Sequence, residues 1–194
     1  MDRQESVKSD KAQRTKERLL RSSLKLMKEK GYRNTTVRDI CNDAKVSIGT
    51  FYSYFPAKDD LFLNIYMEGD RFFTDSVALR LSGESTTEKI VDYFRYYTRL
   101  NLNTGLELMK ILFHSDNPFF SRHRPMQQVF EGIVKDGLES GELKTGLTSR
   151  EIVDYFFVLV RGCCYNWCVN NGSYDLEKQI TDYVKLGLKA MGCG

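Results

Sequence analysis

The chain of 194 residues contains only three prolines, Pro56, Pro118 and Pro125. Because proline is the strongest breaker of helices, the long stretches between these positions can be helical throughout. Apolar residues recur at helical spacing, as at Leu20 and Leu24, and no stretch alternates apolar and polar residues as a half-buried strand would. The sequence therefore predicts an all-α fold of about nine helices.

The composition is that of a globular protein, with 41% apolar and 28% charged residues. These values exclude a collagen-like, low-complexity or wholly disordered chain. A charged N-terminal stretch without an apolar core predicts that there is no secretory signal, and no run of residues is expected to span a membrane. We expect a soluble, cytoplasmic protein.

The cysteines and histidines encode no obvious site. There are five cysteines, an odd number, with no Cys-x-x-Cys pair, and only two histidines. This pattern favours reduced thiols over a disulfide framework or a zinc site, so we expect no metal and no cofactor.

Positive charge is concentrated at one end of the chain. Residues 1–58 contain 14 Lys and Arg against 7 Asp and Glu, whereas the remaining chain contains 15 against 19. A basic segment of this kind favours a polyanionic partner, most often nucleic acid. The alternative is a charged face that is only solvated.

The basic segment reads as three helices. Their expected ranges are about 11–30, 36–44 and 47–55. Gly31 follows the first helix, where a C-terminal glycine is typical. Thr36 and Asp39 form a capping box at the start of the second helix, and Ser47 is placed to cap the third. Two short helices joined by a tight turn behind a basic helix describe a helix-turn-helix.

The composition changes after Pro56, beyond which 19 of the 24 aromatic residues lie. We therefore predict two domains, a helix-turn-helix domain at 1–56 and a larger helical domain at 57–194. Its helices are expected at about 58–81, 86–103, 106–115, 120–140, 149–170 and 175–191.

The third helix has the side chains expected of a helix that enters the major groove. Gly49 lets the backbone approach DNA, and Ile48 or Thr50 is suited to meet a thymine methyl group. The candidate DNA-binding residues are Thr35, Thr36, Ser47, Ile48, Gly49, Thr50, Tyr52, Tyr54 and Lys58. Phe51 and Phe55, at i and i+4, should face inward. The alternative is a small helical subdomain with exposed tyrosines.

The segment GTFYSYF at 49–55, followed by KDDLF at 58–62, resembles the tetracycline-repressor (TetR) family of bacterial transcription regulators. The resemblance is specific over about residues 11–66. It implies phosphate contacts by Thr36, Tyr52, Tyr54 and Lys58, and base reading around Ile48, Gly49 and Thr50. Family members often have glycine where this chain has Lys45, so we expect the turn to tolerate a side chain there and Lys45 to add a DNA contact.

The second domain is expected to hold a mainly apolar effector pocket among its helices. The candidate wall residues are Tyr66, Phe73, Tyr93, Tyr97, Met109, Phe113, Phe130 and Trp167, with His114 and Arg161 as polar anchors. The alternative is that these aromatic residues are core, that His114 caps a helix and that Arg161 forms a structural ion pair.

The last two predicted helices, at about 149–170 and 175–191, should form a homodimer interface. The first is apolar along two stripes, one containing Ile152 and Phe156 and the other Val153 and Phe157, so it needs two partners. The second has a seam of Ile180, Val184, Gly187 and Met191. The resemblance places the family's four-helix dimer interface on these same helices. The alternative is a monomer with a thicker core.

A two-fold dimer would place two recognition helices in successive grooves of a palindromic operator, ~34–36 Å apart. An effector that changes this spacing would weaken DNA binding, so the expected function is that of a repressor released by a small, largely apolar ligand.

Two other functions have partial matches in the sequence. Cys163, Cys164 and Cys168 form a cluster that could sense oxidants or soft metals, although inert buried thiols are the simpler interpretation. The order Ser22-x-x-Lys25, Ser115-Asp116-Asn117 and Lys144-Thr145-Gly146 matches the signatures of serine β-lactamases. We reject that match, because Ser22 is on a basic helix and the chain lacks the strand that Lys-Thr-Gly requires. No catalytic residues are expected.

Overall fold

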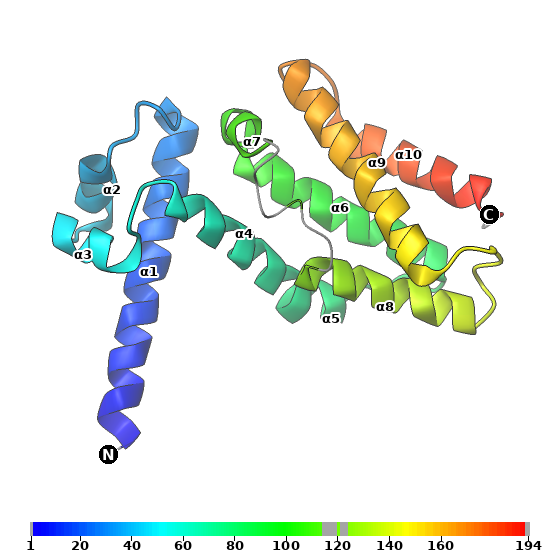
Figure 1. The fold of residues 1–194 in the computed structure, drawn as a ribbon, viewed down its shortest axis with the longest axis horizontal. Coiled ribbons are helices and arrows are strands. Elements are labelled where there is room, and N and C mark those ends of the chain that lie inside the picture. The colour runs from blue at the N-terminus through cyan, green and yellow to red at the C-terminus, as the bar shows by residue number, and fades with distance from the viewer. Residues whose placement is uncertain (1, 114–119, 121–123, 193–194) are drawn as a thin grey trace. The chain divides into compact units, whose positions relative to one another are not determined.

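The structure is a computed structural model that describes residues 2–113, 120 and 124–192, with side chains from residue 11 onward. The described residues form nine helices and no strand (Figure 1), if the consecutive segments α4, η1 and α5 are counted as one. The all-α prediction is confirmed. Contacts divide the chain into two units, Met1–Tyr66 and Met67–Gly194. The division falls inside α4, ten residues beyond the boundary that composition predicts at Pro56.

The first unit contains α1 (Asp2–Lys30), α2 (Val37–Ala44) and α3 (Ile48–Tyr54). The first helix was expected to begin near residue 11, but α1 begins at Asp2, because residues 2–10 contain no glycine or proline to stop it. The buried apolar residues are Leu19, Leu20, Met27, Ile40, Cys41, Ala44, Phe51, Phe55 and Leu61. They come from all three helices and from α4, which gives the small unit a core of its own.

A long helix leads from the first unit into the second. It consists of α4 (Asp60–Phe72), one π-helical turn η1 (Phe73–Val77) and α5 (Ala78–Arg80), and it corresponds to the single helix expected at 58–81. In the π turn the N–H of Ala78 donates to the carbonyl of Phe73. The buried side chains of this turn, Phe73 and Val77, belong to the core of the second unit.

The rest of the second unit comprises α6 (Thr86–Thr104), α7 (Leu106–Leu112), α8 (Pro125–Glu139), α9 (Ser149–Val169) and α10 (Leu176–Ala190). Helix α10 packs against α6 and α9, and α8 packs against α6 and α9. Helix α8 begins at Pro125, later than the expected start near 120, because proline is well suited to the first turn of a helix.

The expectation that no segment could span a membrane is wrong by the measures of length and composition, since α9 passes both. Half of its most apolar window is nevertheless buried inside the protein, where Phe156, Phe157 and Val160 are core residues. This is the environment of a core helix, and such a helix passes the same test.

Candidate nucleic-acid interface

Helix α2 begins at a capping box, as the sequence predicts. The Thr36 hydroxyl accepts a bond from the backbone N–H of Asp39 at 3.1 Å, and the Asp39 carboxylate accepts one from the backbone N–H of Thr36 at 2.9 Å. The same carboxylate accepts a bond from Lys30 Nζ at 2.7 Å. These bonds, first that of Lys30, hold the pKa of the Asp39 carboxyl well below its usual range. The start of α2 is thereby fixed to the end of α1.

The turn between α2 and α3 accommodates a side chain at Lys45, as expected. Lys45 has φ 53° and ψ 50°, in the left-handed region that favours glycine, and its side chain is exposed. Ser47 then caps α3, with its Oγ accepting from the backbone N–H of Thr50 at 3.0 Å. At the α2 end the backbone N–H of Val46 donates to the Cys41 carbonyl at 3.0 Å, so both ends of the turn are fixed by hydrogen bonds.

Helix α3 presents a compact, largely uncharged face to solvent. Ile48 is 42% and Tyr52 51% exposed, while Phe51 and Phe55 are fully buried, as predicted. A Cβ atom at Gly49 would find only Ser47 Oγ within 4 Å, at 3.8 Å, so packing within the protein does not require glycine there. The absence of a side chain instead leaves backbone open beside Ile48 and Tyr52.

Two more of the predicted residues on α3 are partly engaged within the protein. Thr50 is half-buried, and its hydroxyl lies 2.8 Å from Ser47 Oγ. Tyr54 is half-buried and its ring lies 6.4 Å from that of Phe55. Both residues border the exposed face formed by Ile48, Gly49 and Tyr52.

Lys58 and Thr35 have structural contacts that the sequence did not reveal. Lys58 Nζ donates to the carbonyls of Tyr32 at 2.9 Å and Thr35 at 3.1 Å, and it lies 3.7 Å from the centre of the Tyr32 ring. Burial lowers the pKa of Lys58. Thr35 is fully buried and its hydroxyl donates to the Gly31 carbonyl at 2.8 Å. Both residues shape the loop before α2, and the Thr35 side chain is not on the surface.

Two exposed cations near the Thr36 cap were missed by the sequence analysis. Arg33 lies three residues before Thr36, and Arg38 lies in the first turn of α2. Within the described part of the chain neither forms an ion pair. The sequence signal that would have identified them is their position next to the predicted cap, Arg33 three residues before Thr36 and Arg38 two residues after it.

Comparison with known proteins places α2 and α3 in a recognised DNA-binding family. Residues 19–65 match the sequence profile of the bacterial regulatory proteins of the tetR family. The fatty acid metabolism regulator protein of Bacillus subtilis is 24% identical over 166 residues, which cover 81% of this chain and 86% of that protein. The chain belongs to the TetR family. It is a DNA-binding transcriptional regulator and not an enzyme.

The fold is similar to that of two solved transcriptional regulators. FadR of Bacillus subtilis, solved with stearoyl-CoA, superimposes with a TM-score of 0.70 at 22% identity, covering 87% of this chain and 95% of that one. FadR of Thermus thermophilus, a repressor solved with lauroyl-CoA, gives 0.58 at 19% identity, covering 88% and 92%.

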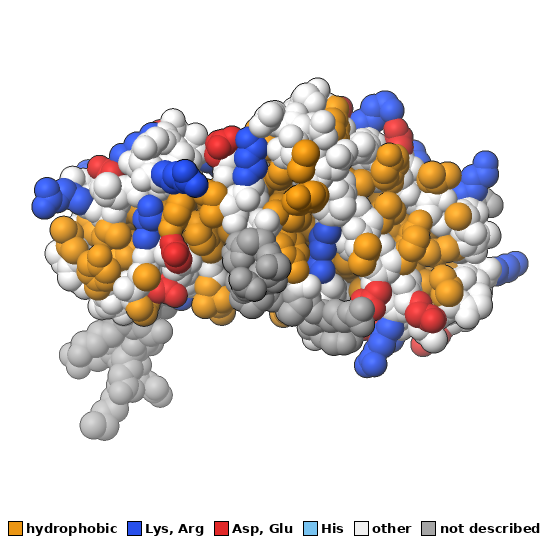
Figure 2. Space-filling view, turned by 45° about the horizontal axis from the view of Figure 1, so that its top comes forward, with side chains coloured by type: hydrophobic (Ala, Val, Ile, Leu, Met, Phe, Trp, Pro, Cys, Tyr) orange, Lys and Arg blue, Asp and Glu red, His pale blue; other side chains and the backbone are white. Residues whose placement is uncertain are grey.

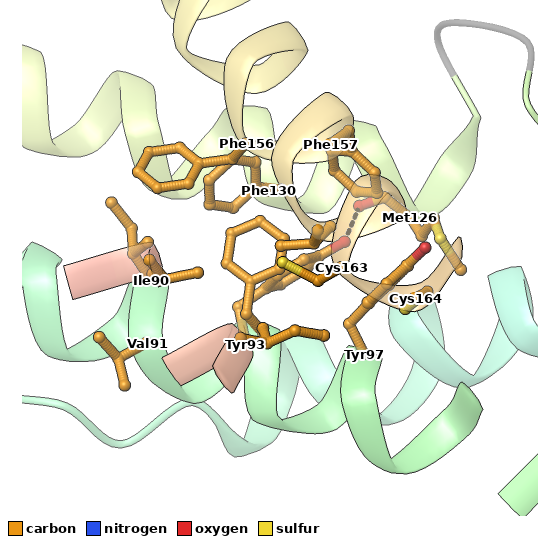
Figure 3. Packing of buried hydrophobic residues seen from close by; sticks show 14 of the residues in the cluster. Ile90, Val91, Tyr93, Tyr97, Met126, Phe130, Phe156, Phe157, Cys163 and Cys164 are labelled. Atoms are coloured by element: carbon orange, nitrogen blue, oxygen red, sulfur yellow. Dashed lines mark hydrogen bonds between the residues drawn. The ribbon is translucent and has the colours of Figure 1, made fainter. Parts of the chain in front are cut away.

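Most of the aromatic residues expected to line an effector pocket in this TetR-family regulator are core residues (Figure 3). Phe73, Tyr93 and Phe130 are fully buried, with the Tyr93 ring 4.8 Å from that of Phe73 and 5.0 Å from that of Phe130. The Tyr93 hydroxyl donates to the Met126 carbonyl at 2.7 Å. Tyr97, Met109 and Trp167 are also buried in this cluster.

The remaining candidates have other surroundings. Phe113 is half-buried and lines a cavity of about 270 Å³ with Tyr165 and Cys168. Tyr66 is half-buried and falls at the end of the first unit. Arg161 donates to the Phe120 carbonyl at 3.1 Å and lies 5.3 Å from the Phe157 ring centre. His114 lies outside the described residues.

A larger groove, of about 790 Å³, lies between α6 and α10 and contains none of the predicted pocket residues. Val91 and Leu188, which line it, are core residues, and several other lining residues are charged. The charged residues are Glu88, Asp92, Arg95, Lys185 and Lys189.

The cysteine cluster on α9 has the environment of inert thiols. Cys163, Cys164 and Cys168 are all buried. Burial raises the pKa of Cys168 to about 11 and that of Cys164 well above its usual range, so the reactive thiolate is scarce at neutral pH. Among the described residues, no group of three His, Cys, Asp or Glu side chains is placed to hold a metal ion.

The residues predicted to face a partner subunit instead face the chain's own core. Ile152, Val153, Phe156 and Phe157 of the two predicted α9 stripes are buried. In the predicted α10 seam Ile180, Val184 and Gly187 are buried and Met191 is half-buried. A Cβ atom at Gly187 would lie 2.9 Å from Cε1 of Tyr155 within the same chain. Gly187 therefore allows α9 and α10 to approach each other.

A different apolar face of α9 and α10 points to solvent, and Figure 2 shows hydrophobic side chains gathered on the surface of the second unit. The exposed residues follow helical spacing, which identifies them as one continuous stripe on each helix. They are Tyr155, Val158, Tyr165 and Val169 on α9, and Tyr183 and Leu186 on α10. This set is named the outward stripe below.

Proposed function

We propose that this TetR-family regulator is a cytoplasmic, dimeric repressor that binds a palindromic operator through α3 and is released by a largely apolar effector. The observation that carries the proposal is the exposed face of Ile48, Gly49 and Tyr52, on a helix fixed at its start by the Ser47 cap. A major groove admits a helix of this kind, and uncharged side chains there read base edges and thymine methyl groups.

The roles proposed for individual residues follow their exposure. Base reading is assigned to the first turns of α3 and phosphate contact to the residues around them. The base-reading residues are Ser47, Ile48, Gly49 and Thr50, and the phosphate-contacting residues are Arg33, Thr36, Arg38, Lys45, Tyr52 and Tyr54. Lys58 and Thr35 are assigned to positioning, because their polar groups are bonded within the protein.

The outward stripe supports dimerisation. Six large apolar side chains exposed along two neighbouring helices form a surface that a soluble protein usually covers. A two-fold contact between copies of α9 and α10 would bury the stripe against itself. Such a dimer would hold two α3 helices at a fixed separation, which a palindromic operator matches.

The effector proposed for the first test is a long-chain acyl-CoA. One relative is a fatty acid metabolism regulator, and two similar structures were solved with acyl-CoA thioesters. An acyl chain would have to separate the packed rings of Phe73, Tyr93 and Phe130. Because Phe73 follows α4 directly and α4 continues into the first unit, a displaced Phe73 would move the helix that leads to the DNA reader.

The deciding experiment is selection of bound duplexes from a random-sequence pool, followed by titration of the selected site with and without stearoyl-CoA. We expect a palindrome, and we expect release at micromolar ligand. Sequences selected without two-fold symmetry would overturn the dimeric reading of DNA. A palindrome that stearoyl-CoA does not release would overturn only the proposed effector class.

A further inference from the structure

Helix α1 has one strongly basic face. Between residues 11 and 30 it contains eight Lys and Arg and only two Glu. Lys11, Arg14, Arg18 and Arg21 are exposed and follow one another at intervals of three or four residues, so they form a row along one side of the helix. These four residues are named the basic row.

The described side chains do not neutralise the basic row. Within the described part of the chain, none of its four members forms an ion pair, whereas Lys25, the next position along the same side, pairs with Asp43 at 2.7 Å. Glu17 lies nearby but accepts a hydrogen bond from Gln13 Nε2 at 2.9 Å. Four like charges on one helix face repel one another, which favours a polyanionic partner.

The basic row leads to the helix-turn-helix. Just beyond the basic row, the Lys25–Asp43 ion pair joins α1 to the last turn of α2. Asp43 lies two residues before Lys45, which is in the turn to α3. The opposite face of α1, with Leu19, Leu20 and Met27, is buried in the core of the first unit. Because no apolar face of α1 remains exposed between residues 11 and 30, the helix lacks what a membrane-surface helix requires.

We propose that the basic row binds the sugar-phosphate backbone next to the sequence read by α3, and so extends the operator beyond the palindrome. The row runs from Lys11 to Arg21, ten helical steps or ~15 Å of helix. The same length of duplex axis has about four phosphates on each strand, so each cation has a phosphate at matching spacing. The inference rests on the proposed operator binding, to which it adds a second contact that is independent of base sequence.

The test uses the full-length protein and the palindrome selected above, once centred in a 60-base-pair duplex and once trimmed to its own ends. The variant is Arg14→Ala/Arg18→Ala/Arg21→Ala, in which alanine preserves helix formation. We expect it to reduce the slope of log Kd against log salt by ~0.9 for each lost contact, which is ~8-fold in affinity per contact at 0.1 M salt. Trimming the duplex should weaken DNA binding by the wild type but not by the variant.

Two controls make the result specific. Arg80→Ala/Lys144→Ala/Lys185→Ala removes the same charge from exposed positions of the second unit that form no ion pair with a described residue, and it should leave the slope unchanged. Arg14→Lys/Arg18→Lys/Arg21→Lys keeps the charge of the basic row and should have the slope of the wild type. Equal slopes in both alanine variants would mean that only net charge matters, and would overturn the proposal. So would a wild type that binds trimmed and long duplexes equally, a result that does not depend on the folding of any variant. Selection of no palindrome at all would instead count against the proposed function.

Discussion

At the scale of single residues, Lys58 shows how a position that resembles a phosphate contact can have an internal role. Its ammonium group bonds two carbonyls of the loop before α2. We expect Lys58→Ala to lower the free energy of unfolding by ~1–3 kcal/mol, while the salt dependence of DNA binding stays unchanged. Urea denaturation and salt titrations measure the two effects. Lys28→Ala, at an exposed lysine of α1, should change stability by less than ~0.5 kcal/mol. If Lys58→Ala instead retains full stability and reduces the slope of log Kd against log salt by about one, Lys58 contacts the DNA backbone.

Asp39 gives the first unit a dependence on pH. Lys30 and Thr36 lower the pKa of its carboxyl in the folded protein, whereas in the unfolded chain it titrates near ~3.9. A lowered folded pKa stabilises the protein above the unfolded value, and the stabilisation is lost as the pH falls. We therefore expect Asp39→Asn to be less stable than the wild type at pH 7, and the difference to shrink below about pH 4. Denaturation midpoints across this range measure it, with the exposed Asp182→Asn as control. A difference independent of pH would show that the carboxylate charge contributes nothing.

At the scale of elements, α8 contains two glycines with opposite surroundings. A Cβ atom at Gly137 would overlap Cγ2 of the buried Thr86 and lie 2.9 Å from Cγ of Leu143, whereas one at Gly132 would have no atom within 4 Å. We expect Gly137→Ala to destabilise the protein by ~1–3 kcal/mol through overpacking against the start of α6. Gly132→Ala should stabilise it by ~0.5–1 kcal/mol, since alanine favours helix. Urea denaturation of both variants compares them directly, and equal effects would show that α8 does not approach α6 as closely as described.

The elements also show what the sequence could predict. The start of α2, the start of α3 and the burial of Phe51 and Phe55 depend on neighbours within four residues, and all were predicted correctly. Helix α9 is apolar on three sides, and which side faces solvent depends on where α7, α8 and α10 pack. Lys58 finds its partners 26 and 23 residues away in the sequence. Spacing alone contains no information on contacts of that range, so the outward stripe and the role of Lys58 needed the structure.

At the scale of the whole molecule, dimerisation should determine the affinity for DNA. Val158 and Leu186 of the outward stripe are 71% and 64% exposed, so charged side chains there disturb the monomer little. We expect Val158→Glu/Leu186→Glu to sediment as a monomer at micromolar concentration, because a two-fold contact places each new carboxylate in an apolar surface close to its symmetry copy. Affinity for the palindrome should fall at least ~100-fold, toward that of a half-site, since the second α3 no longer binds as part of the same molecule.

The control for this prediction is Leu79→Glu, which changes a side chain on α5 that is 84% exposed and lies outside the outward stripe. It should remain dimeric and retain full affinity. If Val158→Glu/Leu186→Glu also remains dimeric, the subunits meet through another surface, and the separation of the two α3 helices is then set by contacts other than those of α9 and α10. If it becomes monomeric but binds the palindrome as tightly as the wild type, each first unit reads its half-site alone. An effector that changes the separation of the two units in a dimer would then not weaken DNA binding.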